Sequence, residues 1–356
     1  MQRPDLTFTP EVEAATADVY AMLKRTIPSV EWPMIAPYIF HINRLKKERN
    51  AVILAHNYMS PAIYHGVADY VGDSLGLARQ AATTEADVIV QGGVKFMAET
   101  SKILSPHKTV LIPDDNAGCS LASGITARDV EMLRQRYPGV PVVCYVNTTA
   151  EVKAACDVCC TSGNALEVVE SLEGDTVLCI PDQYLAKWIA SNTSKRVLTW
   201  EGSCEVHERF SGPELRRYRE EYAGDITIIA HPECPQDVLE EADFVGSTAG
   251  MLKFVNEEAP HRVLMVTECS MSDNLQAENP NIEFIRPCNL CPHMKLISLP
   301  KILDALITLQ PEVVIDEALA ERARLPIDRM LAITERSRLA KPRATSVPKP
   351  APAVAA

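Results

Sequence analysis

Three cysteines at nearly equal intervals are the residues of this chain whose type and spacing point most directly to chemistry. Cys119, Cys204 and Cys291 are separated by 85 and 87 residues, and each follows a turn that contains glycine or proline. Three thiolates leave one iron of a [4Fe–4S] cluster without a protein ligand, whereas a fully ligated cluster carries electrons. We therefore predict one [4Fe–4S] cluster whose open iron acts as a Lewis acid on a bound substrate.

Three pairs of polar residues, each with one residue between its members, follow β-rich segments. The pairs are His56 and Tyr58, Tyr145 and Asn147, and His231 and Glu233. In an extended segment this spacing places both side chains on one side of the strand. An imidazole beside a carboxylate can transfer protons, so His231 and Glu233 are candidates for acid–base catalysis.

Hydroxyl residues stand where helices are expected to begin. Ser74, Ser162 and Thr248, with Ser247 before it, occupy such positions. The first turn of a helix offers free N–H groups and the positive end of the helix dipole, and both favour anions. We therefore expect a small substrate with several carboxylates or a phosphate.

The elements that must position these residues are short β-rich segments that alternate with amphipathic helical stretches. The segments are 51–58, 86–93, 109–115, 140–147, 176–182, 196–202, 225–233, 242–248, 262–269 and 282–287. They fall into three groups, and each group ends on one of the three cysteines. In each group the first strand ends at a polar pair, and a later strand ends at 92–93, 161–162 or 247–248. This pattern is typical of repeated units with parallel sheets covered by helices.

We expect an α/β fold of three homologous three-layer αβα units with short parallel sheets, in a pseudo-threefold arrangement around a central cluster. Ligands of such sheets bind beyond the carboxyl ends of the strands, so the units would share one cavity. The expected parts are a helical extension (1–35), units at 36–130, 131–220 and 221–336, and a disordered tail rich in Pro and Ala (337–356).

Composition argues against several classes of protein. The formal net charge of −12 disfavours binding of nucleic acid, which needs a surplus of Lys and Arg. No apolar run approaches the roughly 20 residues of a membrane span, and the first residues lack the pattern of a signal peptide. Together with the odd count of 11 cysteines, this predicts a cytoplasmic protein in a reducing compartment. The sequence also lacks the glycine motifs that bind nucleotides.

The remaining cysteines leave other interpretations open. Cys156, Cys159 and Cys160 form a C-x-x-C-C run, and Cys288 precedes Cys291 by three residues, which resembles half of a zinc site. A structural use is favoured for Cys156, Cys159 and Cys160, because the last two are embedded in a strand-like segment with apolar neighbours. Cys288 is a candidate for a reversible disulfide with Cys291 when the cluster is lost. The others are expected in the core: Cys144, Cys179, Cys234 and Cys269.

Several longer motifs carry a family resemblance. They are AHNYM, ADYVGDSLGLARQA, GVKFMAETSKIL, AGCSLA, YVNTTAEVKA, CTSGNA, WEGSCEVHERF, AHPEC, GSTAGM and CNLCPHMKLISL, between about residues 51 and 300. These motifs resemble the bacterial quinolinate synthase family. The resemblance implies a transferase that condenses iminoaspartate with dihydroxyacetone phosphate to quinolinate, phosphate and water in NAD biosynthesis. It also implies a functional link to L-aspartate oxidase.

Carried over to this chain, the resemblance implies cluster ligands at Cys119, Cys204 and Cys291, one from each unit. It implies catalytic roles for Tyr58, His231 and Glu233, with Tyr58 and Glu233 as the candidates for proton transfer. The implied substrate-binding positions are His56, Ser74, Tyr145, Val146, Asn147, Ser162, His231, Pro232, Glu233 and Thr248. Many family members have a cysteine where this chain has Gly92, but that cysteine is not one of the implied ligands.

Two other functions fit the same residues. An iron–sulfur hydro-lyase of small hydroxy acids would share the three-cysteine cluster and the carboxylate-binding cavity. A non-catalytic zinc or redox-sensing protein would instead use Cys156, Cys159, Cys160, Cys288 and Cys291. An assay of quinolinate formation distinguishes the hydro-lyase from a quinolinate synthase. Analysis of iron, sulfide and zinc distinguishes the zinc or redox-sensing protein from an iron–sulfur enzyme.

Overall fold

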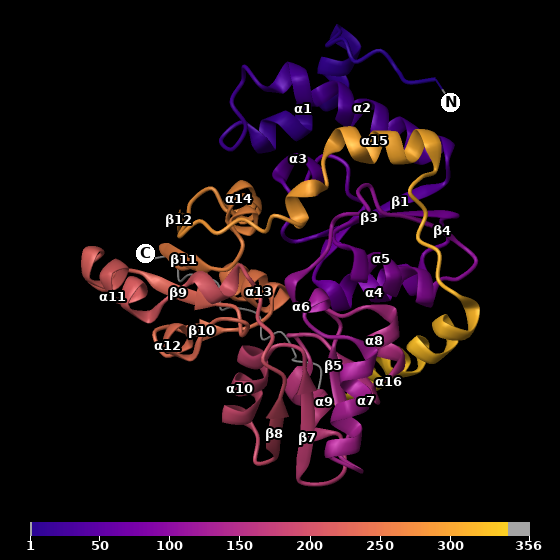
Figure 1. The fold of residues 1–356 in the computed structure, drawn as a ribbon. Helices are drawn as coiled ribbons and strands as arrows, with labels where there is room; N and C mark the ends of the chain where they lie inside the picture. Colours follow the sequence, from indigo (N-terminus) through magenta and orange to yellow (C-terminus); the bar gives the residue numbers. More distant parts are fainter. Residues whose placement is uncertain (1, 341–356) are drawn as a thin grey trace, which may run out of the picture.

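The computed structural model describes residues 2–340, which contain three four-stranded parallel sheets (Figure 1). In every sheet the second strand lies at one edge and is followed by the first, the third and the fourth. The first sheet has β1 (Ala51–His56), β2 (Tyr70–Gly72), β3 (Val88–Gly92) and β4 (Thr109–Leu111). The second has β5 (Val142–Tyr145), β6 (Val158–Cys160), β7 (Thr176–Ile180) and β8 (Arg196–Thr199). The third has β9 (Thr227–Ala230), β10 (Phe244–Val245), β11 (Arg262–Val266) and β12 (Glu283–Ile285).

Helices flank each sheet and connect its strands. The first unit has α3 (Pro61–Tyr64), α4 (Ser74–Thr83), α5 (Lys95–Leu104), α6 (Ser120–Ser123) and α7 (Ala127–Arg136). The second has α8 (Ala150–Ala154), α9 (Ala165–Glu170), α10 (Gln183–Asn192), the 3-10 helix η1 (His207–Arg209) and α11 (Gly212–Glu221). The third has α12 (Gln236–Leu239), α13 (Thr248–Glu258), α14 (Cys269–Glu278) and η2 (Met294–Leu296). The predicted α/β fold of three similar units is confirmed.

The central strands form where the sequence has short, continuous apolar runs. Every residue of β3 and β5 is buried, and β1, β7, β9 and β11 each have one half-buried first residue followed by buried ones. Strands of parallel sheets are buried on both faces, which explains why they lack alternating polar residues. Polar side chains are therefore concentrated after the strands, where the chain leaves the core.

The strand order corrects the predicted alignment of the three groups. The second strands are β2, β6 and β10, and they lead into residues 73–74, 161–162 and 247–248. The counterpart in the first unit is therefore Asp73–Ser74, whereas Gly92 ends a third strand, β3. β2 is absent from the predicted strands because it has three residues and lies at a sheet edge, whereas β6 corresponds to the predicted strand that ends at 161–162.

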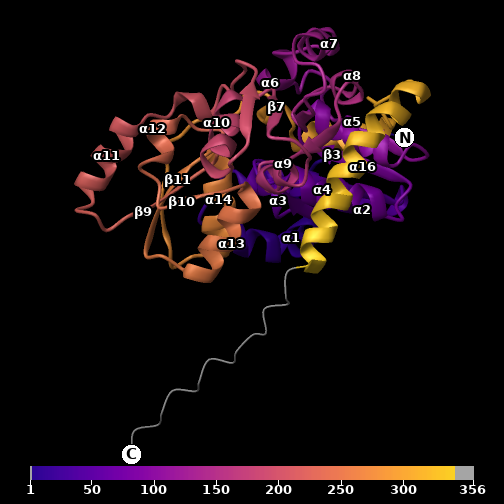
Figure 2. The ribbon, with the colours of Figure 1, turned by 90° about the horizontal axis from the view of Figure 1, so that it is seen from below.

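Helices that precede β1 and follow β12 pack against the units. α1 (Pro10–Leu23) and α2 (Trp32–Glu48) lie at the top of Figure 1, where α15 (Leu299–Thr308) packs against α2. α16 (Glu317–Ala340) runs along the side of the molecule in Figure 2 and packs against α8, β6 and α9 of the second unit. Within residues 2–340, the helices are too short or too polar for a membrane-spanning segment.

The structure also corrects the expected start of the disordered tail. Residues 337–340 form the last turn of α16. The rest of the predicted tail, 341–356, lies outside the described residues. The predicted boundaries of the units stay a prediction. α15 packs mainly against α2 and β3, and α16 packs mainly against α8, β6, α9 and α5, which belong to the first two units.

Candidate active site

A cavity lies where loops of all three units meet. Cys119, Cys204 and Cys291 line it, and they belong to the loops that follow β4, β8 and β12, the fourth strands of the three sheets. Its empty volume is about 710 Å³, including the part open to solvent. The lining also contains these predicted residues: His56, Tyr58, Ser74, Tyr145, Asn147, Ser162, His231, Glu233 and Thr248. Val146 and Pro232 are buried but do not contribute to the lining.

Two imidazoles occupy matching positions in the first and third units. The N–H of Tyr58 donates to Nδ1 of His56 (3.2 Å), and the N–H of Glu233 donates to Nδ1 of His231 (3.4 Å). With Nδ1 as the acceptor, each neutral ring carries its proton on Nε2. Burial lowers the pKa of His56 to about 4 and the pKa of His231 to about 3, so both rings are neutral at pH 7. Each ring therefore offers an N–H donor without a positive charge, and that of His231 meets Ser162 Oγ (3.1 Å).

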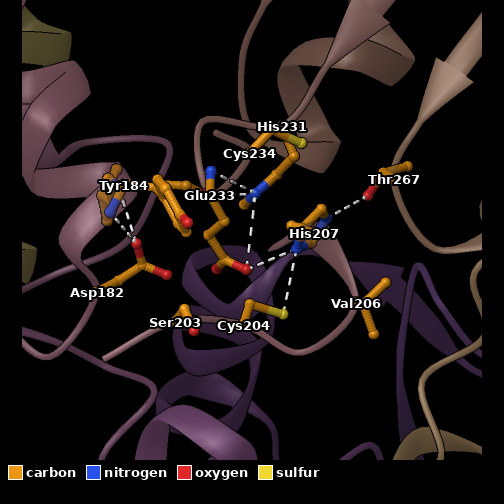
Figure 3. A network of polar contacts seen from close by, with 12 residues as sticks. Asp182, Tyr184, Ser203, Cys204, Val206, His207, His231, Glu233, Cys234 and Thr267 are labelled. Atoms are coloured by element: carbon orange, nitrogen blue, oxygen red, sulfur yellow. Dashed lines mark hydrogen bonds and ion pairs between the residues drawn. The ribbon is translucent and has the colours of Figure 1, made fainter. Parts of the chain in front are cut away.

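Glu233 is a carboxylate enclosed by donors and is only 3% exposed. It accepts hydrogen bonds from the Tyr145 hydroxyl and from Nδ1 of His207 (2.8 Å; Figure 3). Burial raises the pKa of Glu233, but the imidazoles of His231 and His207 and the Tyr145 hydroxyl outweigh burial and hold this pKa below its ordinary value. Glu233 is therefore ionised at neutral pH.

A chain of hydrogen bonds connects Tyr58 to Glu233. The Tyr58 hydroxyl lies 2.6 Å from Thr267 Oγ1, which in turn lies 2.9 Å from Nε2 of His207. Because Nδ1 of His207 donates to Glu233, Nε2 accepts from Thr267, and Thr267 accepts from Tyr58. Burial raises the pKa of the Tyr58 hydroxyl well above its usual value. Tyr58 is therefore protonated at neutral pH, and the chain of hydrogen bonds connects its hydroxyl with His207 beside an ionised carboxylate.

Two of the three predicted helix starts lie at the cavity. The third prediction, a helix that begins at Ser162, is wrong, because α9 begins at Ala165 behind the N-cap Asn164 and Ser162 lies in the turn before it. α4 begins at Ser74 behind the N-cap Asp73, and α13 begins at Thr248 behind the N-cap Ser247. Because Ser74 and Thr248 line the cavity, the positive ends of both helix dipoles face it. Nδ2 of Asn57 donates to Thr248 Oγ1 (2.8 Å), which fixes that hydroxyl.

The three cysteine loops are joined to one another around the cavity. Ser120 Oγ donates to the carbonyl of Ser203 and accepts from the N–H of Glu205, both at 3.2 Å, which joins the loops after β4 and β8. Nε2 of His293 lies 2.9 Å from Glu205 Oε1, which joins the loop after β12. The three loops therefore form one connected rim.

The three thiols suit a metal–sulfur centre. Within the described residues none of them is in a disulfide. Burial raises the pKa of Cys119 to about 12 and also raises the pKa values of Cys204 and Cys291. The three cysteines are half-buried, and thiols with raised pKa values become thiolates when a metal ion supplies the compensating charge.

Cys204 also belongs to a tighter group of possible metal ligands. Its Sγ, a ring nitrogen of His207 and a carboxylate oxygen of Glu233 all lie within 4.8 Å of one another. His207 Nδ1, however, lies 3.2 Å from that sulfur and donates to Glu233. A single ion here would replace the hydrogen bond that orients His207, and it would leave two of the three cysteines unused.

Most of the chain matches a known family. The model of the quinolinate synthetase A protein family matches residues 40–332. The chain belongs to this family. A quinolinate synthase from Sinorhizobium fredii is 60% identical over 94% of this chain and 93% of that protein, and one from Caulobacter vibrioides is 55% identical over 91% and 89%. Quinolinate synthase 2 from Mesorhizobium japonicum is 58% identical over 90% of this chain and 99% of that protein.

Membership of the quinolinate synthase family confirms the resemblance stated from the motifs and the prediction of an enzyme of quinolinate synthesis. Two residues of the cavity region were nevertheless missed in the sequence. His207 lies in η1, three residues after Cys204, and the C-x-x-H spacing in WEGSCEVHERF was a usable signal. Thr267 directly follows β11, and a single threonine after a strand gives no comparable signal.

The structure corrects the predicted partner of Cys288. Cys288 forms a disulfide with Cys269, not with Cys291, so Cys269 is not a free core cysteine. Cys288, one of the ligands in the zinc interpretation, therefore has no free thiol for a metal ion. Cys159 and Cys160 are buried within β6, which agrees with a structural use of these residues.

Proposed function

We propose that this cavity condenses iminoaspartate with dihydroxyacetone phosphate to quinolinate, phosphate and water, with a [4Fe–4S] cluster held by Cys119, Cys204 and Cys291. One observation carries the proposal: each unit contributes one cysteine to a cavity that also holds neutral imidazoles and an ionised carboxylate. The names of relatives that are 55–60% identical support the same activity.

The neutral donors of the cavity are assigned to substrate binding. The two substrates carry carboxylates and a phosphate, and these anions need donors when they leave water. His56 and His231 offer Nε2–H groups, and Ser74 and Thr248 stand at the positive ends of two helices. Asn147, also in the lining, adds an amide donor.

The Tyr58 chain is assigned to proton transfer. When the Tyr58 hydroxyl passes its proton through Thr267 to Nε2 of His207, the resulting imidazolium is stabilised by the Glu233 carboxylate. The phenolate left on Tyr58 can then remove a proton from the substrate. Reversal of the same path returns a proton to a departing hydroxyl group, as a general acid must do.

The cluster is assigned to the three cysteines because, among the described residues, they are the only cysteines in the lining. When bound, the cluster supplies an iron without a protein ligand, and this iron polarises a hydroxyl or carboxylate oxygen of the substrate. The residues of the chain around it bind, orient and protonate the substrate.

The decisive assay uses chain that is purified without oxygen and loaded with iron and sulfide. It is supplied with oxaloacetate, ammonium and dihydroxyacetone phosphate, and quinolinate is measured. The proposal predicts quinolinate in proportion to cluster content, and its absence from cluster-replete enzyme would refute the proposed reaction. Turnover of small hydroxy acids in its place would favour the hydro-lyase. Zinc without sulfide in the purified chain would refute the cofactor assignment.

We also propose a cytoplasmic location and a functional link to L-aspartate oxidase. Iminoaspartate is an imine that water converts to oxaloacetate and ammonium, so fresh supply by oxidation of L-aspartate should increase its availability. At equal total substrate, L-aspartate with the oxidase should give faster quinolinate formation than oxaloacetate with ammonium. Equal rates would contradict the link, and recovery of the chain in the membrane fraction would contradict the location.

A further inference from the structure

The Cys291 loop is held by a buried carboxylate outside the cavity lining. Glu268 is the N-cap of α14 and has no exposed surface (0%). One carboxylate oxygen, Oε2, accepts from the N–H of Ser270 (2.8 Å). The other, Oε1, accepts from the N–H of Cys291 (3.4 Å) and from Nζ of Lys295 (2.9 Å). Both oxygens of Glu268 are therefore engaged, and one of them contacts the main chain of Cys291.

Lys295 completes the hold on the same loop. Its N–H donates to the carbonyl of Cys291 (3.1 Å), so both main-chain polar groups of Cys291 are bonded to the Glu268–Lys295 pair. Nζ of Lys295 also donates to the Tyr58 carbonyl (2.9 Å) and to Ser270 Oγ (2.5 Å). Together with Glu268, these partners account for all three N–H donors of the ammonium group, which fixes its position.

The pair also joins two units of the fold. Tyr58 follows β1 of the first unit, whereas Glu268 and Cys291 belong to the third unit. Lys295 therefore connects the main chain of Tyr58, at the start of the proton-transfer chain, with the loop that carries Cys291. The Cys119 loop makes none of these contacts, since the Cys119 carbonyl accepts from the N–H of Ser123 (3.0 Å).

We propose that Glu268 and Lys295 are positioning residues that fix the Cys291 thiol relative to Tyr58, a role that rests on the proposed function of Cys291 as a ligand. Removing the Lys295 side chain leaves the buried Glu268 carboxylate without its charged partner and breaks the bond to the Tyr58 carbonyl, whereas the main-chain bond from Lys295 to the Cys291 carbonyl remains. The loop then samples positions in which the Cys291 sulfur is no longer directed at the other two cysteines. Iron bound there escapes more readily, and Tyr58 is placed less accurately.

The first test needs no cluster. Metal-free chain in a fixed concentration of thiol reductant is alkylated with iodoacetamide, and modification of Cys291 and Cys119 is followed by peptide mass spectrometry. K295M keeps the apolar stem but removes the donors, and it should raise the ratio of the Cys291 rate to the Cys119 rate by roughly tenfold. E268Q keeps an oxygen acceptor and should raise the ratio of the Cys291 rate to the Cys119 rate by a smaller factor. If K295M folds poorly, the ratio measured in E268Q tests the proposal.

A matched control is available in the first unit. Lys46 Nζ bonds Asp69 Oδ1 (2.7 Å) and the Val67 carbonyl (2.6 Å), so it also joins a carboxylate and a main-chain carbonyl. It lies outside the cavity lining. K46M should leave the ratio of the Cys291 rate to the Cys119 rate within about twofold of wild type, even though it removes a buried ammonium group.

The second test uses the loaded enzyme. After anaerobic reconstitution, loss of the visible iron–sulfur absorption in the presence of a chelator should be roughly tenfold faster in K295M than in wild type, and K295R should restore part of the difference. Unchanged alkylation ratios in both K295M and E268Q would overturn the proposal. A wild-type chain that forms no iron–sulfur centre would instead refute the proposed function, while the alkylation ratio would still decide the role of the pair.

Discussion

Replacement of Thr267 by valine tests the proton-transfer chain at its centre. Thr267 is 1% exposed, and its hydroxyl is the group that lies between the Tyr58 hydroxyl (2.6 Å) and Nε2 of His207 (2.9 Å). Valine has nearly the same shape but no hydroxyl, so T267V removes the connection with little change in packing. The Tyr58 hydroxyl and His207 Nε2 are already 3.5 Å apart, which is too long for an efficient replacement bond.

The size of the effect follows from the buried groups. A buried polar group left without its partner costs about 1–3 kcal/mol, so the free energy of unfolding should fall by about that amount. Proton transfer by a positioned group contributes about 10²- to 10⁴-fold to a rate, so kcat should fall by about 10²-fold or more, or about 3 kcal/mol of barrier. T267S, which restores the hydroxyl, should stay within about tenfold of wild type.

The assay measures quinolinate formation without oxygen, at matched iron and sulfide content per chain. Matched content is needed because Thr267 is followed by Glu268, which contacts the Cys291 loop. A T267V enzyme with full cluster content and kcat within about twofold of wild type would refute the assignment of Tyr58, Thr267 and His207 to proton transfer.

Further predictions concern other parts of the cavity and its surroundings. In C204S the iron and sulfide content should fall well below wild type, and full cluster occupancy would contradict the ligand assignment. S162A removes the hydroxyl that meets His231 Nε2 (3.1 Å), so KM should rise by about tenfold with a smaller change in kcat, and a selective loss of kcat would argue against a binding role. Burial, and then the nearby charge of Glu233, raises the pKa of Asp182 well above its usual value, and Figure 3 shows its side chain directed toward Glu233. The folded chain then retains a proton that the unfolded chain releases above about pH 4, so Asp182 lowers the free energy of unfolding as pH rises. In denaturant titrations, D182N should therefore stabilise the chain more at pH 8 than at pH 5. Equal stabilisation at both pH values would contradict this. C288S should lower the free energy of unfolding of the oxidised chain by about 3 kcal/mol and leave the reduced chain nearly unchanged, whereas equal losses in both states would contradict a role for the Cys269–Cys288 bond.

The sequence predicts the parts of the site that repeat. His56 with Tyr58 and His231 with Glu233 recur after the first strands of two units, and the structure gives both imidazoles the same main-chain hydrogen bond. That correspondence depends on strand periodicity, which a sequence displays directly.

Other parts depend on contacts between units, which no local pattern displays. Thr267 and His207 meet only because the second and third units pack together. The missed strand, β2, has three residues, too few for a periodic signal. Val146 lies between the lining residues Tyr145 and Asn147 but does not line the cavity itself. Successive side chains of an extended segment point to opposite sides, so Val146 points away from the cavity and is 3% exposed.

The central claim is that three cysteines, one from each unit, hold a cluster whose unliganded iron receives the substrate. Mössbauer spectra of chain loaded with isotopically enriched iron test this most directly, recorded with and without substrate. The account predicts about four irons per chain, with the signal of one iron changing when substrate binds and the other three unchanged. A spectrum that does not respond to substrate, or a chain that binds a single metal ion without sulfide, would contradict it.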